Sequence, residues 1–515
     1  MGNLSRISSR FPLLLLLASF AVPLAILGVF PQWTVDDAFI AYRYGKHLQE
    51  FGELNWNPGQ PPVEGYTGIL LPLLAAAALA LKLPLLISIK LLSALATGGT
   101  AALMLSILRR FEVRPRIQLV VVVLFLSAPS VYVHQSSGLE TSIFTFFMVL
   151  AFWGHLRLLL TPPRAADCLL YSASLLLLSL TRPEGVLLSL LSLGLVSAHL
   201  YRQQKSRAAL LLIAIWLVPA ILYMAWRIDH YGHWLPNSFA AKQATGWIQP
   251  ESIKSLVRFL GQHALLPLLS ASLLLLLEYD RRDAHWSHWK TLGRFSWPGV
   301  LFMLGCWLVY FRSDLYMNYA SRFFFPFFPL LLLLAAVWGE AGWRSLQQKR
   351  GEHPQRTRLV GQLLIVAGVL QMGIFAFKWR GELAFVRYYS SIVEDEYRPV
   401  AKWLREHLDE DATVICYLDA GAIPYYSGRR AVDMGRLNDA FLARENPDLD
   451  AVVDYFFSYG AEAVVMTSEK KDDYIYLEEA EVIRADPRFQ QYELIEVFEN
   501  DVGFPYFQWV YRKAQ

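Results

Sequence analysis

Long apolar runs dominate this chain and restrict what it can fold into. Runs of about 20 residues, the length that a helix needs to cross a lipid bilayer, recur between residues 11 and 377. The chain has 515 residues and is 55% hydrophobic but only 18% charged. We therefore predict a polytopic α-helical membrane protein with roughly eleven transmembrane helices. The expected spans are residues 11–30, 85–108, 117–134, 142–160, 166–181, 186–200, 208–226, 262–279, 296–311, 323–341 and 359–377.

One further apolar run, at residues 69–83, is expected not to cross the membrane. If it crossed, the basic cluster of Arg109, Arg110, Arg114 and Arg116 would lie on the outer side, against the positive-inside rule. We therefore expect an interfacial or re-entrant helix in this run.

The distribution of basic residues predicts the orientation of the chain. Arg6 and Arg10 precede the first run and should keep the N-terminus in the cytoplasm. The alternation of spans then places a first outer loop, residues 31–67, and everything beyond Lys378 on the opposite side. We expect a transmembrane catalytic domain over residues 1–377 and a periplasmic or extracellular α/β domain over residues 378–515.

The C-terminal segment has the pattern of a small soluble domain. Helices are expected at residues 395–408 and 449–459, and strands at 412–418, 461–467, 492–498 and 507–511. A Gly- and Tyr-rich turn, residues 419–430, follows the first strand. Ligand sites of open sheets tend to lie at such strand ends, although a plain structural turn explains the pattern equally well.

The first outer loop contains the candidate catalytic acids. Asp36 and Asp37 are adjacent, and Thr34 with Asp37 has the spacing of a capping box, so a helix should begin here, just outside the membrane. Two acids at a helix start also stabilise the helix dipole, which is a purely structural alternative. The turn formers and aromatic residues that follow could build a carbohydrate-sized polar pocket.

Several basic residues are expected on the same outer face. Arg182, Arg312, Arg322 and Lys242 are candidates for binding a phosphate, since guanidinium groups bond phosphate oxygens in a bidentate manner. Each one alone could instead be an interfacial anchor whose charge reaches the headgroups. Together with a carboxylate that removes a proton from a hydroxyl, they suit a transfer reaction whose donor is a lipid-linked phosphate.

An ordered series of motifs runs through nearly the whole chain. It comprises residues 36–40 with Arg43 and Tyr44, 56–59, 63–67, 137–141, 181–185, 231–232 and 235–238 with Lys242, Arg322 with Pro326 and Pro329, and 419–421 with 425–428. In this series the chain resembles the GT-C superfamily of membrane glycosyltransferases that use polyprenyl-phosphate sugars. It is most similar to the terminal arabinofuranosyltransferase group and to related lipopolysaccharide-biosynthesis membrane proteins.

The resemblance implies an inverting sugar transfer at the outer face of a bacterial inner (cytoplasmic) membrane. The general base would be Asp36 or Asp37, with Asp36 slightly favoured because Asp37 is the capping-box partner. Donor phosphate would meet Arg182, Arg322, Lys242 and Arg312. The expected substrate-binding residues are Arg43, Tyr44, Trp56, Asn57, Glu64, Tyr66, Glu140, Glu184 and Asn237.

The predicted function is therefore transfer of a sugar, preferably arabinofuranose, from a polyprenyl phosphate to a glycan, glycolipid or surface protein. Membrane lipid, the donor and the acceptor are the expected partners, and nucleic acid is not. No cofactor is assigned. His230 and His233, close to Asp229, have a spacing that could hold a divalent metal, but they form no strong ligand pattern, so a metal is not implied. Two alternatives stay open: a flippase for lipid-linked sugars, which needs polar residues inside the bundle, and a non-catalytic assembly partner.

Overall fold

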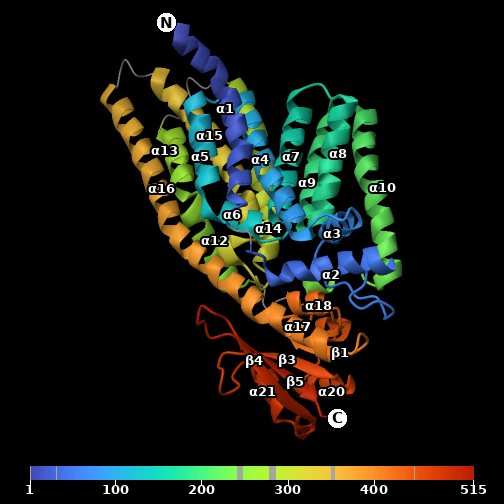
Figure 1. Ribbon diagram of the computed structural model, residues 1–515. Coiled ribbons are helices and arrows are strands. Elements are labelled where there is room, and N and C mark those ends of the chain that lie inside the picture. Colours follow the sequence, from blue (N-terminus) through green and yellow to red (C-terminus); the bar gives the residue numbers. More distant parts are fainter. Residues whose placement is uncertain are drawn as a thin grey trace.

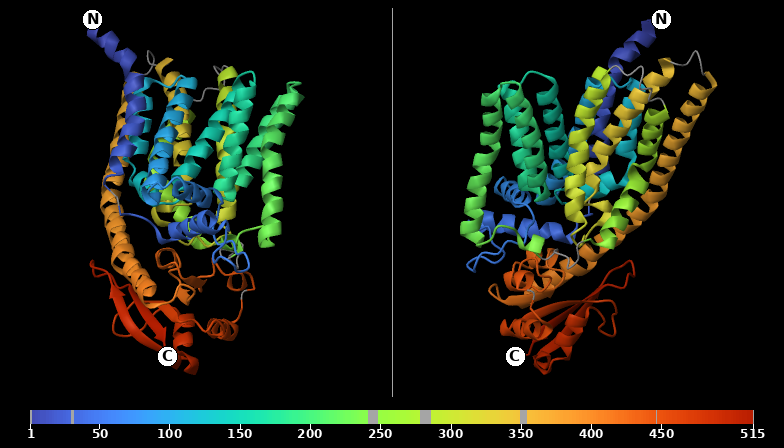
Figure 2. Two further views of the ribbon diagram at one scale, coloured as in Figure 1. Left: turned by 45° about the vertical axis from the view of Figure 1, so that its right-hand side comes forward. Right: turned by 180° about the vertical axis from the view of Figure 1, so that it is seen from behind.

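The computed structural model describes residues 2–29, 32–240, 248–277, 286–348, 354–445 and 447–514. Figures 1 and 2 show a helical bundle above a small C-terminal domain that contains the sheet. The bundle helices are α1 (Gly2–Ile26), α4 (Leu85–Arg110), α5 (Pro115–Ser127), α6 (Pro129–Ser136), α7 (Thr141–Leu160), α8 (Ala165–Thr181), α9 (Glu184–Arg202), α10 (Ser206–Tyr231), α13 (Leu265–Leu277), α14 (Trp286–Tyr310), α15 (Phe328–Gln348) and α16 (Pro354–Ser391).

The fold class predicted for the bundle is confirmed. Within the described residues, seven helices are long and apolar enough to cross a membrane, or eight if α5 and α6 form one bent span. Shorter apolar helices cover Pro12–Ile26, Leu70–Ala80 and Ala165–Thr181. The expected number of eleven spans stays a prediction.

One expected span is broken in the middle. Residues 117–134 were expected as one helix, but α5 and α6 meet at an angle of 53°. Ala128 lies between them with extended backbone angles, φ −70° and ψ 123°. Pro129 explains the break, because a proline disfavours helical geometry in the residue before it and cannot donate a backbone hydrogen bond.

Short elements close the end of the bundle that faces the C-terminal domain. They are α2 (Asp36–Phe51), α3 (Leu70–Ala80), α11 (Asn237–Ala240), α12 (Pro250–His263) and the short η1 (Tyr319–Ser321) and η2 (Phe325–Phe327). Helix α2 runs across the bundle rather than along it, and α3 packs against it (Figure 1). With 11 residues, α3 is about 16 Å long, too short to cross a bilayer of about 30 Å.

Helix α2 begins at Asp36 as expected, but without the predicted capping box. Its N-cap residue is Val35, and no side chain caps it. Thr34 Oγ1 is buried and has no hydrogen-bond partner among the described residues. The capping-box interpretation was wrong because the carboxylate of Asp37 turns toward Arg322 instead.

The link to the C-terminal domain is a continuous helical segment. Helix α16 passes through the boundary expected at residues 377 and 378, and a single helical stretch reaches from Thr357 to His407. It continues as η3 (Ile392–Tyr397) and α17 (Arg398–His407).

The C-terminal domain is built on a five-stranded mixed sheet, so the predicted α/β domain is confirmed. The strand order is β2-β1-β3-β5-β4. Strands β1 (Thr413–Tyr417), β2 (Arg430–Asp433) and β3 (Ala463–Ser468) are parallel, while β5 (Phe507–Lys513) pairs antiparallel with β3 and with β4 (Tyr492–Glu499). The helices are α18 (Ala422–Ser427), α19 (Ala440–Arg444), α20 (Leu449–Ser458), α21 (Glu478–Ala485) and the short η4 (Pro487–Gln491).

The C-terminal domain shares a hydrophobic core with α2. The ring of Phe39 lies 5.5 Å from that of Tyr425 and 5.2 Å from that of Tyr426. Buried residues of the sheet, such as Val414 and Ala431, belong to the same core as Trp33 and Phe39. Because apolar side chains pack across the contact, α2 is a shared element of both domains.

Candidate functional site

A polar pocket lies where α2 meets the bundle. Its polar lining residues are Asp37, Tyr66, Thr67, Glu140, Ser238 and Arg322. Apolar side chains of α2 and α3, including Ile40 and Leu71, complete the wall, and Leu437 of the C-terminal domain also reaches it. The pocket therefore combines α2 and the segment that follows it, the bundle and the C-terminal domain.

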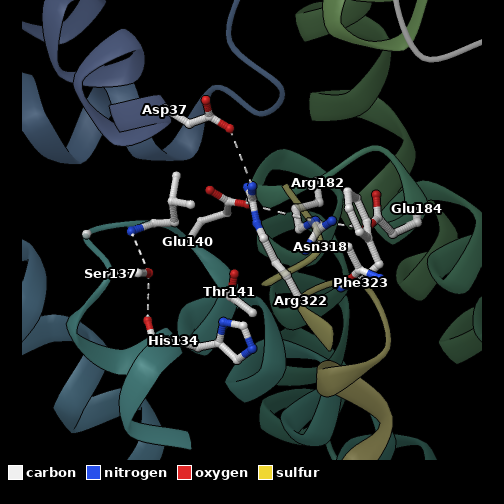
Figure 3. A network of polar contacts seen from close by, with 12 residues as sticks. Asp37, His134, Ser137, Glu140, Thr141, Arg182, Glu184, Asn318, Arg322 and Phe323 are labelled. Atoms are coloured by element: carbon white, nitrogen blue, oxygen red, sulfur yellow. Dashed lines mark hydrogen bonds and ion pairs between the residues drawn. The ribbon is translucent and has the colours of Figure 1, made fainter. Parts of the chain in front are cut away.

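Three charged residues from distant parts of the chain meet at this pocket. Asp37 Oδ2 lies 3.7 Å from Nη1 of Arg322, and Oε1 of Glu140 lies 3.3 Å from Nη2 (Figure 3). The side chain of Asp37 is 29% exposed, whereas those of Arg322 and Glu140 are at most 9% exposed. Asp37 is thus an accessible carboxylate in front of a buried guanidinium.

A second buried arginine, Arg182, lies close to Glu140, which also pairs with Arg322. Arg182 Nε lies 2.8 Å from Oε1 of Glu184 and 3.8 Å from Oε1 of Glu140, and Tyr310 donates a hydrogen bond of 2.7 Å to Glu184. The guanidinium of Arg182 lies over the ring of Phe323, 5.2 Å from the ring centre (Figure 3). These contacts fix the orientation of the guanidinium.

The two arginines control the charge of Glu140. Burial alone would raise the pKa of this carboxyl, but Arg322 and then Arg182 outweigh burial and hold the pKa below its usual value. Glu140 thus stays ionised between the two guanidinium groups. The network of Asp37, Glu140, Glu184 and the two arginines contains three carboxylates for two cations.

Polar atoms without protein partners gather around the pocket. Among the described residues, Nε of Arg322, Nη1 of Arg182, Oγ1 of Thr141, Oγ of Ser238 and Nδ2 of Asn237 are buried and form no hydrogen bond. Buried polar atoms are rarely left unpaired, because each one costs about 1–3 kcal/mol. Such a concentration indicates a place for water or for a polar ligand.

Asp36 faces away from this pocket. Its Oδ2 accepts a hydrogen bond of 2.9 Å from the backbone N–H of Gly421, and Oδ1 accepts one of 2.7 Å from Ala422. Burial and the neighbouring Asp419 raise the pKa of Asp36 well above its usual value, although the two hydrogen bonds act in the opposite direction. In this structure Asp36 joins α2 to the turn after β1.

Arg43, Trp56 and Asn57 also connect α2 to the C-terminal domain. Arg43 donates hydrogen bonds to the carbonyl oxygens of Pro424 and Arg429 and lies over the ring of Trp56, at 4.8 Å. The indole of Trp56 donates to the carbonyl of Ala431 at 2.7 Å, and Asn57 also bonds Ala431. All three side chains are buried, so they brace the contact.

The loop after α2 is held by further buried pairs. Glu64 forms an ion pair of 2.8 Å with Arg227, and Tyr66 OH lies 3.1 Å from Tyr231 OH. Tyr44 OH donates to the carbonyl of Val63 at 2.8 Å. Of these residues only Tyr66 lines the pocket.

Asn237 is buried beside the pocket. Its Oδ1 accepts a hydrogen bond of 2.7 Å from Arg444 of the C-terminal domain, which ties α11 to α19. Its neighbour Ser238 lines the pocket.

The other predicted residues lie elsewhere. Arg312 is an exposed residue in the turn after α14 and does not line the pocket. Lys242 falls outside the described residues. In the part of the chain that the structure describes, no three His, Cys, Asp or Glu side chains converge as metal ligands would.

Arg227 and Arg444 are partners that the sequence reasoning missed. Arg227 lies near the end of α10 and neutralises Glu64, and Arg444 reaches Asn237 from α19. A signal existed for Arg227, because it is a basic residue at a span end that is expected to lie outside, where the positive-inside rule predicts few such residues. No local pattern distinguishes Arg444.

The sequence comparisons cover little of the chain. A family described as a domain of unknown function, DUF8728, matches residues 387–511, which contain strands β1 to β4 and most of β5. A comparison with curated protein sequences gives no match.

Solved structures match over most of the chain. ArnT from Cupriavidus metallidurans bound to undecaprenyl phosphate has a TM-score of 0.60 and 11% identity, with 96% of this chain and 97% of that chain covered. The oligosaccharyltransferase AglB from Archaeoglobus fulgidus, in complex with an inhibitory peptide and a dolichol-phosphate, has a TM-score of 0.53 and 11% identity, with 89% of this chain and 69% of that chain covered.

The arabinofuranosyltransferase AftD from Mycobacteria has a TM-score of 0.51 and 12% identity, with 97% of this chain but 40% of that chain covered. At these identities the likeness to ArnT, AglB and AftD is one of fold. The fold predicted from the resemblance is therefore confirmed.

Proposed function

We propose that this chain, which has the fold of the GT-C membrane glycosyltransferases, transfers a sugar from a polyprenyl phosphate to an acceptor hydroxyl. The observation that carries the proposal is the position of Asp37, an accessible carboxylate 3.7 Å from the buried guanidinium of Arg322 at the mouth of a polar pocket. A proton acceptor and a phosphate binder are the two groups that this transfer needs.

The proposed reaction is a single displacement at the anomeric carbon of the donor sugar. Asp37 takes the proton from the acceptor hydroxyl, whose oxygen forms a bond to the anomeric carbon while the bond between that carbon and the phosphate oxygen breaks. Arg322, supported by Arg182, stabilises the negative charge on the polyprenyl phosphate that leaves. A single displacement of this kind inverts the configuration at the anomeric carbon.

Asp37, rather than Asp36, is proposed as the base. Both carboxylate oxygens of Asp36 accept backbone hydrogen bonds, and the side chain faces the C-terminal domain. Asp37 lines the pocket, and among the described residues its carboxylate forms one ion pair, the 3.7 Å contact with Arg322. An incoming phosphate would compete for Arg322 and leave the carboxylate of Asp37 free to accept a proton.

The neighbouring structures support the choice of donor. ArnT was solved with undecaprenyl phosphate and AglB with a dolichol-phosphate. Arabinofuranose is proposed as the sugar from the motif resemblance, and the name of AftD supports it. The acceptor would be a glycan, glycolipid or surface protein at the outer face of a bacterial cytoplasmic membrane, where the C-terminal domain would lie.

The experiment compares wild type, Asp37→Asn and Asp36→Asn in nanodiscs with polyprenyl-phosphoryl sugars, arabinofuranose first, and short glycan acceptors. Released polyprenyl phosphate and glycosylated product are both measured. We expect Asp37→Asn to lose about 10²–10⁴-fold in turnover without a change in thermal stability. The same turnover in Asp37→Asn and wild type would reject the proposed base.

Asp36→Asn is the matched control. An asparagine presents one acceptor oxygen instead of two, so one of the two backbone N–H groups loses its partner, at a cost of about 1–3 kcal/mol. This variant should unfold at a lower temperature but retain turnover in its folded fraction. A wild type that moves the intact donor across the membrane without releasing polyprenyl phosphate would favour the flippase alternative.

A further inference from the structure

A second cavity lies at the end of the bundle opposite the C-terminal domain. It has a volume of about 600 Å³. The last turns of α4 and α7 and the first turn of α8 form its walls, and these ends lie together in Figures 1 and 2. The proposed glycosyl transfer uses none of its residues.

Basic side chains dominate this cavity. Arg109, Arg110, Arg157 and Arg164 line it, and Asp167 is the only acid among the lining residues. Asp167 forms an ion pair of 2.9 Å with Arg157. Within the described part of the chain, the other three arginines form no ion pair, so the cavity carries uncompensated positive charge.

The cavity also offers an oriented donor. Arg157 lies over the ring of Trp153, at 4.9 Å, and the indole N–H of Trp153 donates to Ser106 at 3.0 Å. Nε of Arg157 is buried and has no hydrogen-bond partner among the described residues. A guanidinium held against an aromatic ring with a free N–H is suited to a phosphate oxygen.

The surroundings of the cavity are apolar and exposed. Leu169 and Leu170, shortly after Asp167 on α8, are 57% and 42% exposed. Leu13 and Leu14 on α1 are 56% and 59% exposed, and the carbonyl of the adjacent Pro12 accepts a hydrogen bond from Arg109. Lipid-facing side chains therefore lie beside the basic cavity, where acyl chains could run along the helices.

We propose that this cavity binds the headgroup of an anionic diacyl phospholipid. Phosphate esters are the ligand chemistry that uncompensated arginines recognise, and basic pockets between membrane helices bind such headgroups. The adjoining leucines favour a lipid over a free phosphate ion, because only a lipid also covers apolar surface. This inference does not depend on the proposed glycosyl transfer.

The test is native mass spectrometry of delipidated protein titrated with phosphatidylglycerol or with phosphatidylcholine. Wild type is expected to prefer phosphatidylglycerol. The variant Arg110→Gln/Arg164→Gln should bind it about 25-fold more weakly, since each basic residue near the surface contributes about fivefold. Arg164→Gln alone changes an exposed side chain, so it should fold and bind about fivefold more weakly.

The matched control is Arg202→Gln/Arg207→Gln, which removes two exposed arginines at the end of α9 and the start of α10, outside the cavity. This control should bind phosphatidylglycerol as wild type does. Equally weakened binding of phosphatidylglycerol in the two double variants would overturn the proposal. It would indicate that the lipid is attracted by the overall positive charge of this end of the bundle and not by the cavity. Displacement of phosphatidylglycerol by inorganic phosphate at similar concentrations would also overturn it, in favour of a free-anion site.

Discussion

His47 shows at the residue scale how burial changes the chemistry of a side chain. It lies on the buried face of α2, and Nδ1 is 3.0 Å from the carbonyl oxygen of Asn55. Burial and then the nearby Arg43 lower the pKa of its imidazole to about 3. In the unfolded chain the pKa is about 6.5. Below that pH the unfolded state binds more protons, so this histidine makes the protein less stable as the pH falls.

The prediction is a pH-dependent difference between wild type and His47→Gln, whose amide can still donate to Asn55. From about pH 7 to about pH 5 this histidine should cost wild type about 2 kcal/mol of unfolding free energy. The midpoint of thermal unfolding should therefore fall more in wild type than in the variant. The same dependence of the unfolding midpoint on pH in both proteins would contradict this prediction. Wild type must be compared with the variant because burial also raises the pKa of Asp36 and of Asp419, and these two groups make the protein more stable as the pH falls.

At the element scale, the packing of α2 against the turn after β1 depends on a glycine. A Cβ atom at Gly421 would lie 2.1 Å from the backbone oxygen of Asp36 and 2.5 Å from its Oδ2. Both distances are far below van der Waals contact, and a backbone oxygen cannot move aside easily. Gly421→Ala should therefore separate α2 from the turn and destabilise the protein by about 1–3 kcal/mol.

Thermal unfolding of the full chain measures this effect. Gly381→Ala in α16 is the matched control, because a Cβ atom there meets nothing within 4 Å. The control should keep or slightly raise the unfolding temperature, since alanine favours a helix. Equal unfolding temperatures for Gly421→Ala and wild type would mean that α2 and the turn are not packed as described.

Elements with a clear period could be predicted from the sequence, and short or interrupted ones could not. Strands β1, β3, β4 and β5 and helix α20 lie at or within about two residues of their expected ranges. Strand β2 has four residues and begins with an exposed arginine, so it carries no strand pattern. The break before Pro129 was missed because the hydrophobic run continues across it.

The sequence allowed the residues of the candidate site to be predicted, but not which of them contact one another. Asp37, Glu140, Arg182, Glu184 and Arg322 were all singled out, and the structure brings them into one network. The proposal of Asp37 rather than Asp36 as the base rests on the turn after β1, which lies far along the chain and donates hydrogen bonds to Asp36. Sequence spacing contains no information about such a contact.

At the scale of the whole molecule, the C-terminal domain supplies hydrogen-bond partners for α2 and the loop that follows it. Trp56 and Asn57 bond the backbone of Ala431, Arg43 bonds the backbone of Pro424 and Arg429, and Tyr44 lies 3.2 Å from Oδ1 of Asn438. Deletion of residues 387–515 would remove these partners together. Each polar group left without its partner would destabilise the folded conformation of the loop by about 1–3 kcal/mol. The sum of these costs exceeds what a loop of this size can tolerate.

We therefore expect the loop between α2 and α3 to become mobile in the truncated protein while the far end of the bundle persists. Limited chymotrypsin digestion, followed by mass spectrometry, should cut the truncated protein after Trp56 and Tyr66, which are both buried in the full chain. Tyr201 at the opposite end is 72% exposed and should be cut equally in both proteins. If Trp56 and Tyr66 resisted cleavage equally in both, the loop would hold its shape without the C-terminal domain. The pocket wall formed by Tyr66 would then depend on the bundle alone.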